Sequence, residues 1–492
     1  MFESAELGHK VSKQEYEREV PKLREALLDA QFELSQRAGF QVILLIGGVD
    51  GAGKGETVNL LNDWMDPHHI HTVAFSDPDQ QERERPYMWR FWRALPPKGK
   101  IGIFFGSWYT EPIVDRVMGH AKTADFDQRL QEIVRFEKML TDEGALVLKF
   151  WFHLSREKQK TRLESLQKNP KTRWRVAETA WDRFKKYDKF KKISEHALRL
   201  TSTAEAPWIV VEGMDSNYRN LTVGKTLLAA LEEKLKESRL TKPANGFPLL
   251  PTIDNRHILG SLDLGLHLAK HEYEKQLDYY QGKLSQLSRH PGFEKRSVIA
   301  VFEGPDAAGK GGGIKKITNA LDARKYQVIP VAAPTDEELA HPYLWRFWRH
   351  MPGHGRFTLF DRSWYGRVLV ERVEKFCSEA DWMRGYNEIN DFEQQLVENG
   401  AFLFKFWIAI SKEEQLARFE ERQKIGFKRF KITEEDWRNR EKWNDYETAV
   451  CDMVDRTSTD SAPWTLVEGN DKYYARIRIL KTLCEKIEKE IS

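Results

Sequence analysis

SVIAVFEGPDAAGKG, residues 297–311, is the stretch that decides the fold. Seven mostly apolar residues of strand length lead into a glycine-rich loop, and Lys310 stands in the first turn of the helix predicted to follow it. Glycines at both ends of such a loop let backbone N–H groups turn toward one anion, and the helix adds its positive end. We therefore predict a phosphate-binding loop, with Lys310 as its point charge. Its backbone would contact phosphate through Gly304, Ala307, Ala308, Gly309, Gly311 and Gly312.

The same stretch occurs a second time in the chain, as QVILLIGGVDGAGKG at residues 41–55. The lysines of the two loops, Lys54 and Lys310, lie 256 residues apart. Three further pairs of motifs keep this offset: PYMWRFWR (86–93) with PYLWRFWR (342–349), KFWFHLS (149–155) with KFWIAIS (405–411), and TSTAEAPW (201–208) with TSTDSAPW (457–464). The chain is one domain written twice. A proline-rich stretch at 240–255 is the predicted linker, and the predicted domains are 1–240 and 256–492.

Each half alternates predicted strands with predicted helices. A charged helical arm (13–37 and 267–289) precedes the first strand, and in the second half further strands end at Asp361 or begin at Ala401 and Ala462. Strands alternating with helices imply a parallel sheet covered on both faces. The expected fold is thus two tandem three-layer α/β/α domains.

Composition narrows the class of protein. The 492 residues are 40% hydrophobic with a net charge of +3, and no apolar run is long enough to cross a bilayer, so we expect neither a membrane segment nor a nucleic-acid partner. The charged amino end fits no signal peptide, and three cysteines without metal-ligand spacing fit no disulfide framework. We expect a cytoplasmic protein, which could assemble as a homo-oligomer.

The two halves differ where phosphoryl chemistry would need charged groups. LFDRSWYGRV (359–368) lies opposite IFFGSWYTEP (103–112), so Asp361 faces Phe105 and Arg362 faces Gly106. Downstream, Arg440, Asp445, Lys472 and Arg476 of the second half also face residues of other types, namely Phe184, Lys189, Ser216 and Asn220. Charged groups lost together indicate a relaxed catalytic site, so we predict a working site in the second half and a degenerate copy in the first.

Two carboxylates are the candidate magnesium ligands. The loop has Gly311 where Ser or Thr usually ligates the metal, so other oxygens must do so. Asp361 closes a predicted strand, where a parallel sheet presents residues to ligands, and Asp306 lies inside the loop. Asp50 keeps the position of Asp306 in the first half, so a simple turn residue is the alternative for Asp306.

Several arginines and a basic segment are candidate phosphate contacts. Arg362 and Arg367 suit the charge of a metaphosphate-like transition state, with surface ion pairs as the alternative. Arg346 and Arg349 recur in the first half, so either phosphate binding or structural pairing fits them. A predicted lid over a highly charged substrate carries Arg422, Lys424, Lys428, Arg429 and Lys431, although such a run also occurs on solvated helix faces.

These residues resemble the polyphosphate kinase 2 family over nearly the whole chain. The motifs that carry the resemblance are EGPDAAGKGG (303–312), DRSWYGRVLVERV (361–373), REKWNDY (440–446), TSTDSAPW and NDKYYARIR (470–478). The resemblance implies a P-loop kinase fold with helical lids, and transfer of a terminal phosphoryl group from polyphosphate to a nucleotide with Mg²⁺. It implies that Asp306, Lys310, Asp361 and Arg362 are the catalytic set and that Arg372 joins the phosphate or nucleotide contacts. Gly366 departs from the Asn that is common in the family motif.

The expected activity is transfer of phosphoryl from polyphosphate to AMP, giving ADP, in the second domain. An ATP-dependent nucleoside monophosphate kinase is one alternative, because a phosphate loop does not report what the phosphate is attached to; supplying each donor alone separates the two. A regulator that binds polyphosphate or nucleotide without turnover is the other alternative. Asp361 and Arg362 argue against a regulator, and binding without ADP formation would establish it.

Overall fold

The computed structural model describes residues 1–176, 178–237, 258–425 and 434–491. Two compact units make up the chain. The first comprises Met1–Pro78, Arg90–Lys242 and Pro334–Trp345, and the second comprises Asp79–Trp89, Pro243–Ala333 and Arg346–Ser492. The two units are described separately below.

The first unit contains a parallel five-stranded sheet with the order β2-β3-β1-β4-β5. Its strands are β1 (Val42–Gly48), β2 (Ile70–Ala74), β3 (Ile101–Phe105), β4 (Leu146–His153) and β5 (Trp208–Glu212). The central strand β1 pairs on one side with β3 and on the other with β4, so that Val42 lies in register with Ile101 and Leu146. Burial of β1 on both faces explains its continuous apolar sequence.

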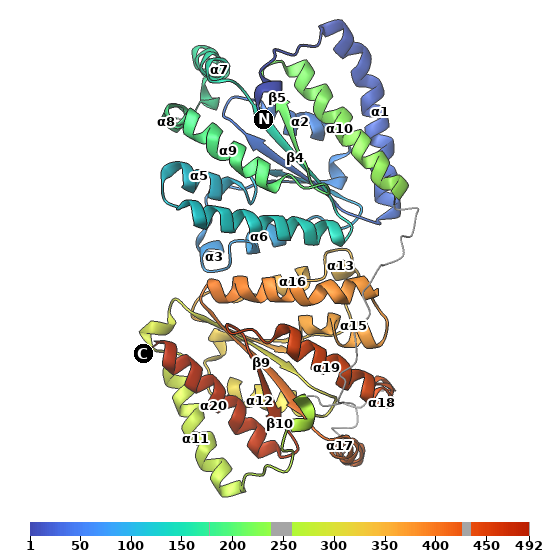
Figure 1. Ribbon diagram of the computed structural model, residues 1–492, viewed down its shortest axis with the longest axis vertical. Coiled ribbons are helices and arrows are strands. Elements are labelled where there is room, and N and C mark those ends of the chain that lie inside the picture. The colour runs from blue at the N-terminus through green and yellow to red at the C-terminus, as the bar shows by residue number, and fades with distance from the viewer. Residues whose placement is uncertain (177, 238–257, 426–433, 492) are drawn as a thin grey trace. The chain divides into compact units, whose positions relative to one another are not determined.

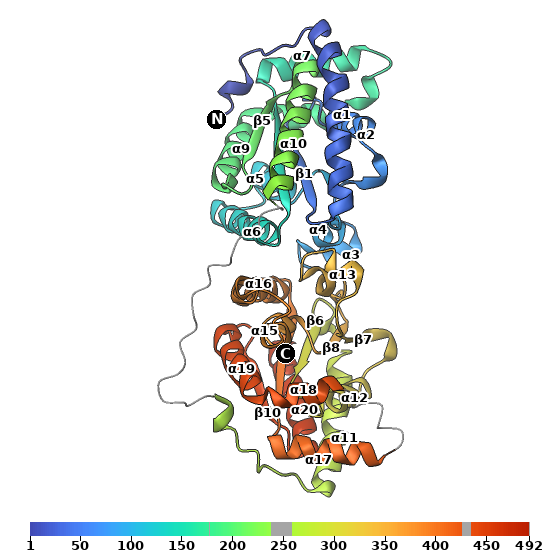
Figure 2. The same cartoon turned by 90° about the vertical axis from the view of Figure 1, so that its right-hand side faces the viewer.

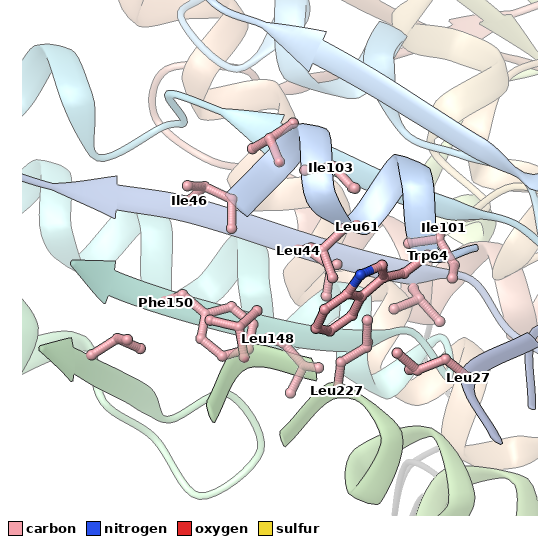
Figure 3. Packing of buried hydrophobic residues seen from close by; sticks show 14 of the residues in the cluster. Leu27, Leu44, Ile46, Leu61, Trp64, Ile101, Ile103, Leu148, Phe150 and Leu227 are labelled. Atoms are coloured by element: carbon pink, nitrogen blue, oxygen red, sulfur yellow. The ribbon is translucent and has the colours of Figure 1, made fainter. Parts of the chain in front are cut away.

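Helices cover both faces of this sheet, as Figures 1 and 2 show. One layer consists of α1 (Lys13–Arg37), α2 (Lys54–Trp64) and α10 (Ser216–Glu237), and the other of α5 (Thr110–Met118), α6 (Thr123–Asp142) and α9 (Tyr187–Thr201). Figure 3 shows the core under the first layer, where Trp64 and Leu227 meet Leu44 of the central strand. The other helices of this half of the sequence are α3 (Gln80–Arg83), which belongs to the second compact unit, α4 (Trp89–Ala94), α7 (Arg156–Lys168) and α8 (Glu178–Lys185).

The second unit repeats the topology, with the order β10-β9-β6-β8-β7. Its strands are β6 (Ser297–Glu303), β7 (Tyr326–Pro330), β8 (Phe357–Asp361), β9 (Ala401–Ala409) and β10 (Trp464–Glu468). One helical layer is α11 (Lys270–Leu287), α12 (Lys310–Thr318) and α20 (Lys472–Ile491), and the other is α15 (Val370–Val373), α16 (Glu379–Glu398) and α19 (Trp443–Thr457). The remaining helices of this half of the sequence are α13 (Asp336–Leu339), which belongs to the first compact unit, α14 (Trp345–Trp348), α17 (Lys412–Lys424) and α18 (Glu434–Glu441).

The predicted fold class is confirmed: each half is a parallel sheet between two helical layers. The predicted strands and helical arms are present, but the edge strands β2 and β7 were not predicted. Both edge strands are largely exposed and lack the apolar run that marks the central strands. The predicted linker at 240–255 lies outside the described residues. No helix in the described ranges is long and apolar enough to span a membrane.

A buried ion pair explains why several motifs occur in both halves. In the second unit, Lys405 Nζ donates to Glu393 Oε2 at 2.7 Å and to the carbonyl of Thr457 at 2.6 Å. The indole of Trp364 and the hydroxyl of Tyr365 both donate to Glu393 Oε1. Lys149, Glu137, Thr201, Trp108 and Tyr109 form the same arrangement in the first unit. The shared SWY, KFW and TST motifs thus stabilise the fold.

Candidate active site

The phosphate loop of the second unit connects β6 to α12, as predicted. Lys310 Nζ donates to the carbonyls of Gly304 at 2.7 Å and Pro305 at 3.2 Å, which curls the loop around the lysine. Gly304 has a φ of 147°, and a Cβ there would lie 2.6 Å from the carbonyl oxygen of Ile408. Only glycine fits this close approach of loop and strand.

Arg418 on α17 holds the loop from outside. Its guanidinium, only 3% exposed, donates to the carbonyls of Ala307 and Ala308 and to those of Gly469 and Asn470. These bonds turn the loop carbonyls toward Arg418, so the backbone N–H groups on the opposite side of the same peptides can bind an anion. Arg418 therefore shapes the loop, and its bonds to carbonyls occupy donors that could otherwise contact phosphate.

Asp306 is held by two side chains from other elements. Arg362 Nη2 donates to its Oδ1 at 2.7 Å, and the Asn439 amide on α18 donates to its Oδ2 at 3.0 Å. Burial alone would raise the pKa of Asp306, but Lys310, Arg362 and the Asn439 bond together hold it below its usual value. The Asp306 carboxylate therefore bonds groups across the site and does not simply close its own turn.

Asp361 ends β8 beside the loop, where the sequence placed it. A Cβ on Gly311 would lie 3.9 Å from Asp361 Oδ2, so this carboxylate reaches the first turn of α12. Asp361 and Asp306 supply oxygen ligands of the kind Mg²⁺ prefers, and the missing loop hydroxyl at Gly311 leaves room between them and a bound phosphate. No group of three or more metal-ligating side chains occurs in the described part of the chain. Phosphate oxygens and waters would therefore have to supply the other ligands of an ion held by these two carboxylates.

Glu303 is a third acid at this place and was not predicted. Its carboxyl is 5% exposed and accepts a 2.7 Å hydrogen bond from Ser363. Burial raises the pKa of Glu303; Ser363, Lys310 and Arg362 oppose this shift, while the nearby Asp361 adds to it. The signal was present in the sequence, because Glu303 faces Gly47 at the 256-residue offset.

Two residues of this site have a backbone conformation that favours glycine. Arg362 has a φ of 63° and Ala307 a φ of 64°, whereas their first-half equivalents, Gly106 and Gly51, are glycines with φ of 78° and 79°. A non-glycine residue in the left-handed region costs about 1 kcal/mol or more. The second unit tolerates this strain at Arg362, which points to a function for its side chain.

A cavity of about 370 Å³ opens on one side of the loop, called the acidic cavity here. Its charged lining side chains are five acids and two bases: Glu303, Asp306, Glu413, Glu435, Glu447, Arg362 and Lys412. Trp407, Trp443 and Tyr446 add aromatic walls, and Gly366 lines it too. Such an excess of acid suits a site that receives a metal ion together with a nucleotide.

A second cavity of about 270 Å³, the basic cavity, lies on the other side of the loop. Its lining includes the first turn of α12 and four basic side chains against one acid: Arg418, Arg422, Lys472, Arg476 and Glu421. The structure thus brings the predicted lid residue Arg422 to the loop. Lys424 ends α17, while Lys428, Arg429 and Lys431 lie outside the described residues.

The other predicted arginines have partners elsewhere in the protein. Arg346 donates to the carbonyl of Ala332, and Arg349 is exposed beyond the end of α14. Arg367 pairs with Glu371 at 3.1 Å. Arg372 pairs with Asp452 at 2.7 Å, bonds the Tyr386 hydroxyl and stacks on Trp382. None of the four is among the residues that line the acidic or the basic cavity.

The first unit has the same loop, but its own side chains pair at the anion site. Arg219, 2% exposed, donates to Glu56 Oε2 at 3.0 Å and to the carbonyl of Gly213 at 2.9 Å. A Cβ on Gly53 would lie 2.1 Å from Arg219 Nη1, so the guanidinium packs directly on the loop. The corresponding residues of the second unit are Gly312 and Ala475, which line the basic cavity. An internal ion pair therefore occupies in the first unit the space that is open in the second.

Comparisons with known proteins agree with this duplication. The sequence profile of the family Polyphosphate kinase 2 matches residues 10–239 and again 267–492. The chain is 56% identical to a polyphosphate:AMP phosphotransferase of Pseudomonas aeruginosa, with 99% of each chain covered. It is 37% identical to an Acinetobacter johnsonii protein of the same name, covering 94% of this chain and 95% of the relative.

A solved structure extends the likeness to three dimensions. A crystal structure of a polyphosphate kinase 2 from Pseudomonas aeruginosa superposes with a TM-score of 0.89 at 55% identity, covering 100% of this chain and 99% of the other. Two matches of one family profile, in register with two phosphate loops, account for both halves of the sequence. The chain belongs to the polyphosphate kinase 2 family.

Proposed function

We propose that this chain transfers the terminal phosphoryl group of inorganic polyphosphate to AMP, giving ADP, and that turnover occurs in the second unit. The observation that carries the proposal is the pair of cavities on the two sides of one phosphate loop. Residues 304–306 line the acidic cavity, and residues 307–309, 312 and 313 line the basic one. A donor on one side and an acceptor on the other would meet at Lys310.

The basic cavity suits polyphosphate. Arg422, Lys472 and Arg476 line it beside a glycine-rich helix start, whose backbone N–H groups would meet an anion without obstruction from side chains. The donors of Arg418, the fourth basic residue, are occupied by loop carbonyls. A polyphosphate chain carries charge along its whole length, so a row of arginines and lysines would bind it irrespective of chain length. Arg422 and Lys424 would extend this row along α17.

The acidic cavity suits the nucleotide. Its aromatic walls would stack on a nucleobase. Asp306 in its lining, together with Asp361 at the end of β8, would hold Mg²⁺. When bound, the metal ion would neutralise charge on the phosphate oxygens. The rest falls to this chain: Lys310 and the loop amides would orient the phosphoryl group, and Arg362 would contact its oxygens as charge develops. No covalent intermediate is required.

Matched substitutions in the two halves test this proposal. Asp361→Ala should lower ADP formation from polyphosphate and AMP by on the order of 100-fold or more, because it removes a metal ligand at the reacting group. Asp50→Ala in the first unit should leave most of the activity. Equal losses in the two variants would contradict the assignment of turnover to the second unit. ATP supplied as sole donor tests the rival kinase, and AMP binding without ADP formation would establish the regulator.

A further inference from the structure

The first unit keeps a cavity on the side of its loop that faces away from the Arg219–Glu56 pair. This cavity measures about 370 Å³, the same as the acidic cavity of the second unit, and is called the aromatic cavity here. Most of its lining positions correspond to those of the acidic cavity at the 256-residue offset: Gly47, Gly48, Val49, Asp50, Gly106, Thr110, Ile113, Val114, Trp151, Gln159, Arg183, Tyr187 and Phe190. Loss of the catalytic side chains has therefore not closed the site.

The chemistry of the lining has changed. Among its charged lining side chains, one acid, Asp50, stands against three bases, Lys54, Arg183 and Lys186. Asp50 is neutralised by Arg183, whose Nε donates to its Oδ2 at 2.7 Å. The acidic cavity of the second unit has the opposite balance. The aromatic cavity thus attracts an anion, and it lacks the carboxylates that would bring a metal ion with that anion.

Aromatic rings form much of the wall of this cavity. Phe105 takes the place of Asp361, and Trp151, Tyr187 and Phe190 also line the space. Trp151 and Phe190 stack with their ring centroids 5.9 Å apart. A wall of this kind favours a planar ring system as ligand. Its volume is within the range of small-molecule sites, which excludes a macromolecular ligand.

Two buried polar atoms of lining residues have no hydrogen-bond partner among the described residues: Trp151 Nε1 and Gln159 Oε1. In the second unit the equivalent oxygen, Gln415 Oε1, accepts a 3.2 Å hydrogen bond from Arg440, but Phe184 occupies that position in the first unit. Unpaired buried polar atoms are costly and uncommon. A nucleobase that carries both hydrogen-bond donors and acceptors could bond Trp151 Nε1 and Gln159 Oε1 after small rotations of these side chains.

The ligand's phosphate part is limited by the other side of the loop. Arg219 and Glu56 fill the space where the second unit has its basic cavity, so a phosphate chain cannot continue past the loop. A single phosphate fits, because Lys54 and the first loop residues, Gly48, Val49 and Asp50, line the cavity.

We propose that the first unit is a non-catalytic binding site for a nucleoside monophosphate, which it takes without a metal ion and from which polyphosphate is excluded. The site is separate from the proposed active site; its binding of the ligand does not depend on where turnover occurs, and its being non-catalytic rests on the proposed turnover in the second unit. The aromatic wall indicates a nucleobase, and the loop closed by Arg219 limits the ligand to one phosphate. The shortage of free acids in the lining indicates that the ligand binds without a metal ion.

Equilibrium dialysis of labelled AMP against the full chain in EDTA tests the proposal. The two halves offer a matched pair, because Val114 lines the aromatic cavity and its equivalent Val370 lines the acidic one. Val114→Trp fills the aromatic cavity and should lower the number of AMP molecules bound per chain by one. Lys54→Met should weaken the same site at least 10-fold. Val370→Trp should leave this site intact.

Competition identifies the ligand class. Unlabelled AMP should displace the label from this site at least 10-fold more effectively than adenosine or inorganic phosphate alone, and polyphosphate should not displace it. The thermal transition of each variant, together with turnover of Val114→Trp, shows that the chain is folded. AMP binding in EDTA that survives both Val114→Trp and Lys54→Met would overturn the proposal, as would the absence of such binding or displacement by polyphosphate.

Discussion

Arg362 Nη2 donates to Asp306 Oδ1 at 2.7 Å, and this contact joins the end of β8 to the phosphate loop. In the first unit, Asp50 at the position of Asp306 is bonded instead by Arg183, because Gly106 replaces Arg362. Asn439 on α18, at the position of Arg183, also bonds Asp306, through Oδ2. Asp50 is thus held from the α8 side, whereas Asp306 is held both from the equivalent α18 side and from the end of β8.

Arg362 provides a test that separates strain from catalysis. Because its φ of 63° suits glycine, Arg362→Gly should be more stable than Arg362→Ala by about 1 kcal/mol, although both lose the contact with Asp306. Both variants should lower kcat for ADP formation by on the order of 100-fold. Denaturant unfolding and steady-state kinetics measure the two effects. Equal stability of the variants would show that the backbone relaxes when the side chain is removed.

Much of the site follows from the sequence because duplication provides an internal comparison. The loop, Lys310, Asp361 and Arg362 were placed by motif and by contrast with the first half, and the structure brings them together. Glu303 and Asn439 were available from the same comparison, since each faces a residue of another type. They were missed because a strand-end acid and a helical amide carry no motif of their own.

Other features depend on three-dimensional packing that no local pattern contains. Arg219 reaches the loop and α2 from a helix more than 160 residues later in the chain. Its equivalent in the second unit is Ala475, so the sequence near the loop does not predict this contact. The arginines of the WRFWR motifs looked equally suitable for phosphate, but Arg346 is used by a backbone carbonyl of its own half. The helical periodicity of the sequence predicts which face of a helix such arginines share, but not which groups they contact.

Placing the glutamate of the first unit's loop at the equivalent position of the second unit tests whether the basic cavity binds polyphosphate. Gly312→Glu copies Glu56 into the second unit, where a Cβ at this position would lie 3.4 Å from Arg476 Nη2. The new carboxylate would pair with the cavity's bases and repel phosphate, so KM for polyphosphate should rise about 10-fold or more, equivalent to roughly 1.4 kcal/mol. Glu56→Gly is the matched control and should leave this KM unchanged. An unaltered KM in Gly312→Glu would place polyphosphate elsewhere.

Glu303 predicts a stability change with pH of known sign. Burial raises its pKa above the ordinary 4.5, so the folded state favours the protonated form. Its contribution to stability is fully present below pH 4.5 and is lost as pH rises through the raised pKa. Glu303→Gln cannot lose a proton, so its unfolding free energy should improve relative to wild type as pH increases over this interval. Chemical denaturation in EDTA measures the difference.

Asp306 provides the opposite case and an internal control for Glu303. Its pKa is lowered below 3.8, so its stabilising contribution is present above that pH and disappears as pH falls through the lowered value. The difference between wild type and Asp306→Asn should therefore change only in more acid solution. A stability difference for Glu303→Gln that is constant from pH 4 to pH 8 would contradict the raised pKa.

The buried lysines predict equal structural costs and unequal functional ones. Lys149→Met and Lys405→Met each leave a glutamate buried without its cation, which costs about 3–5 kcal/mol in such pairs. Burial already raises the pKa of Glu137 and Glu393, so protonation of the carboxyl would moderate both losses alike. Lys405 also bonds Tyr365, three residues from Arg362, whereas Lys149 supports the segment that contains Gly106. At a temperature where both variants are folded, only Lys405→Met should show reduced kcat, and equal reductions would mean that the first unit contributes directly to turnover.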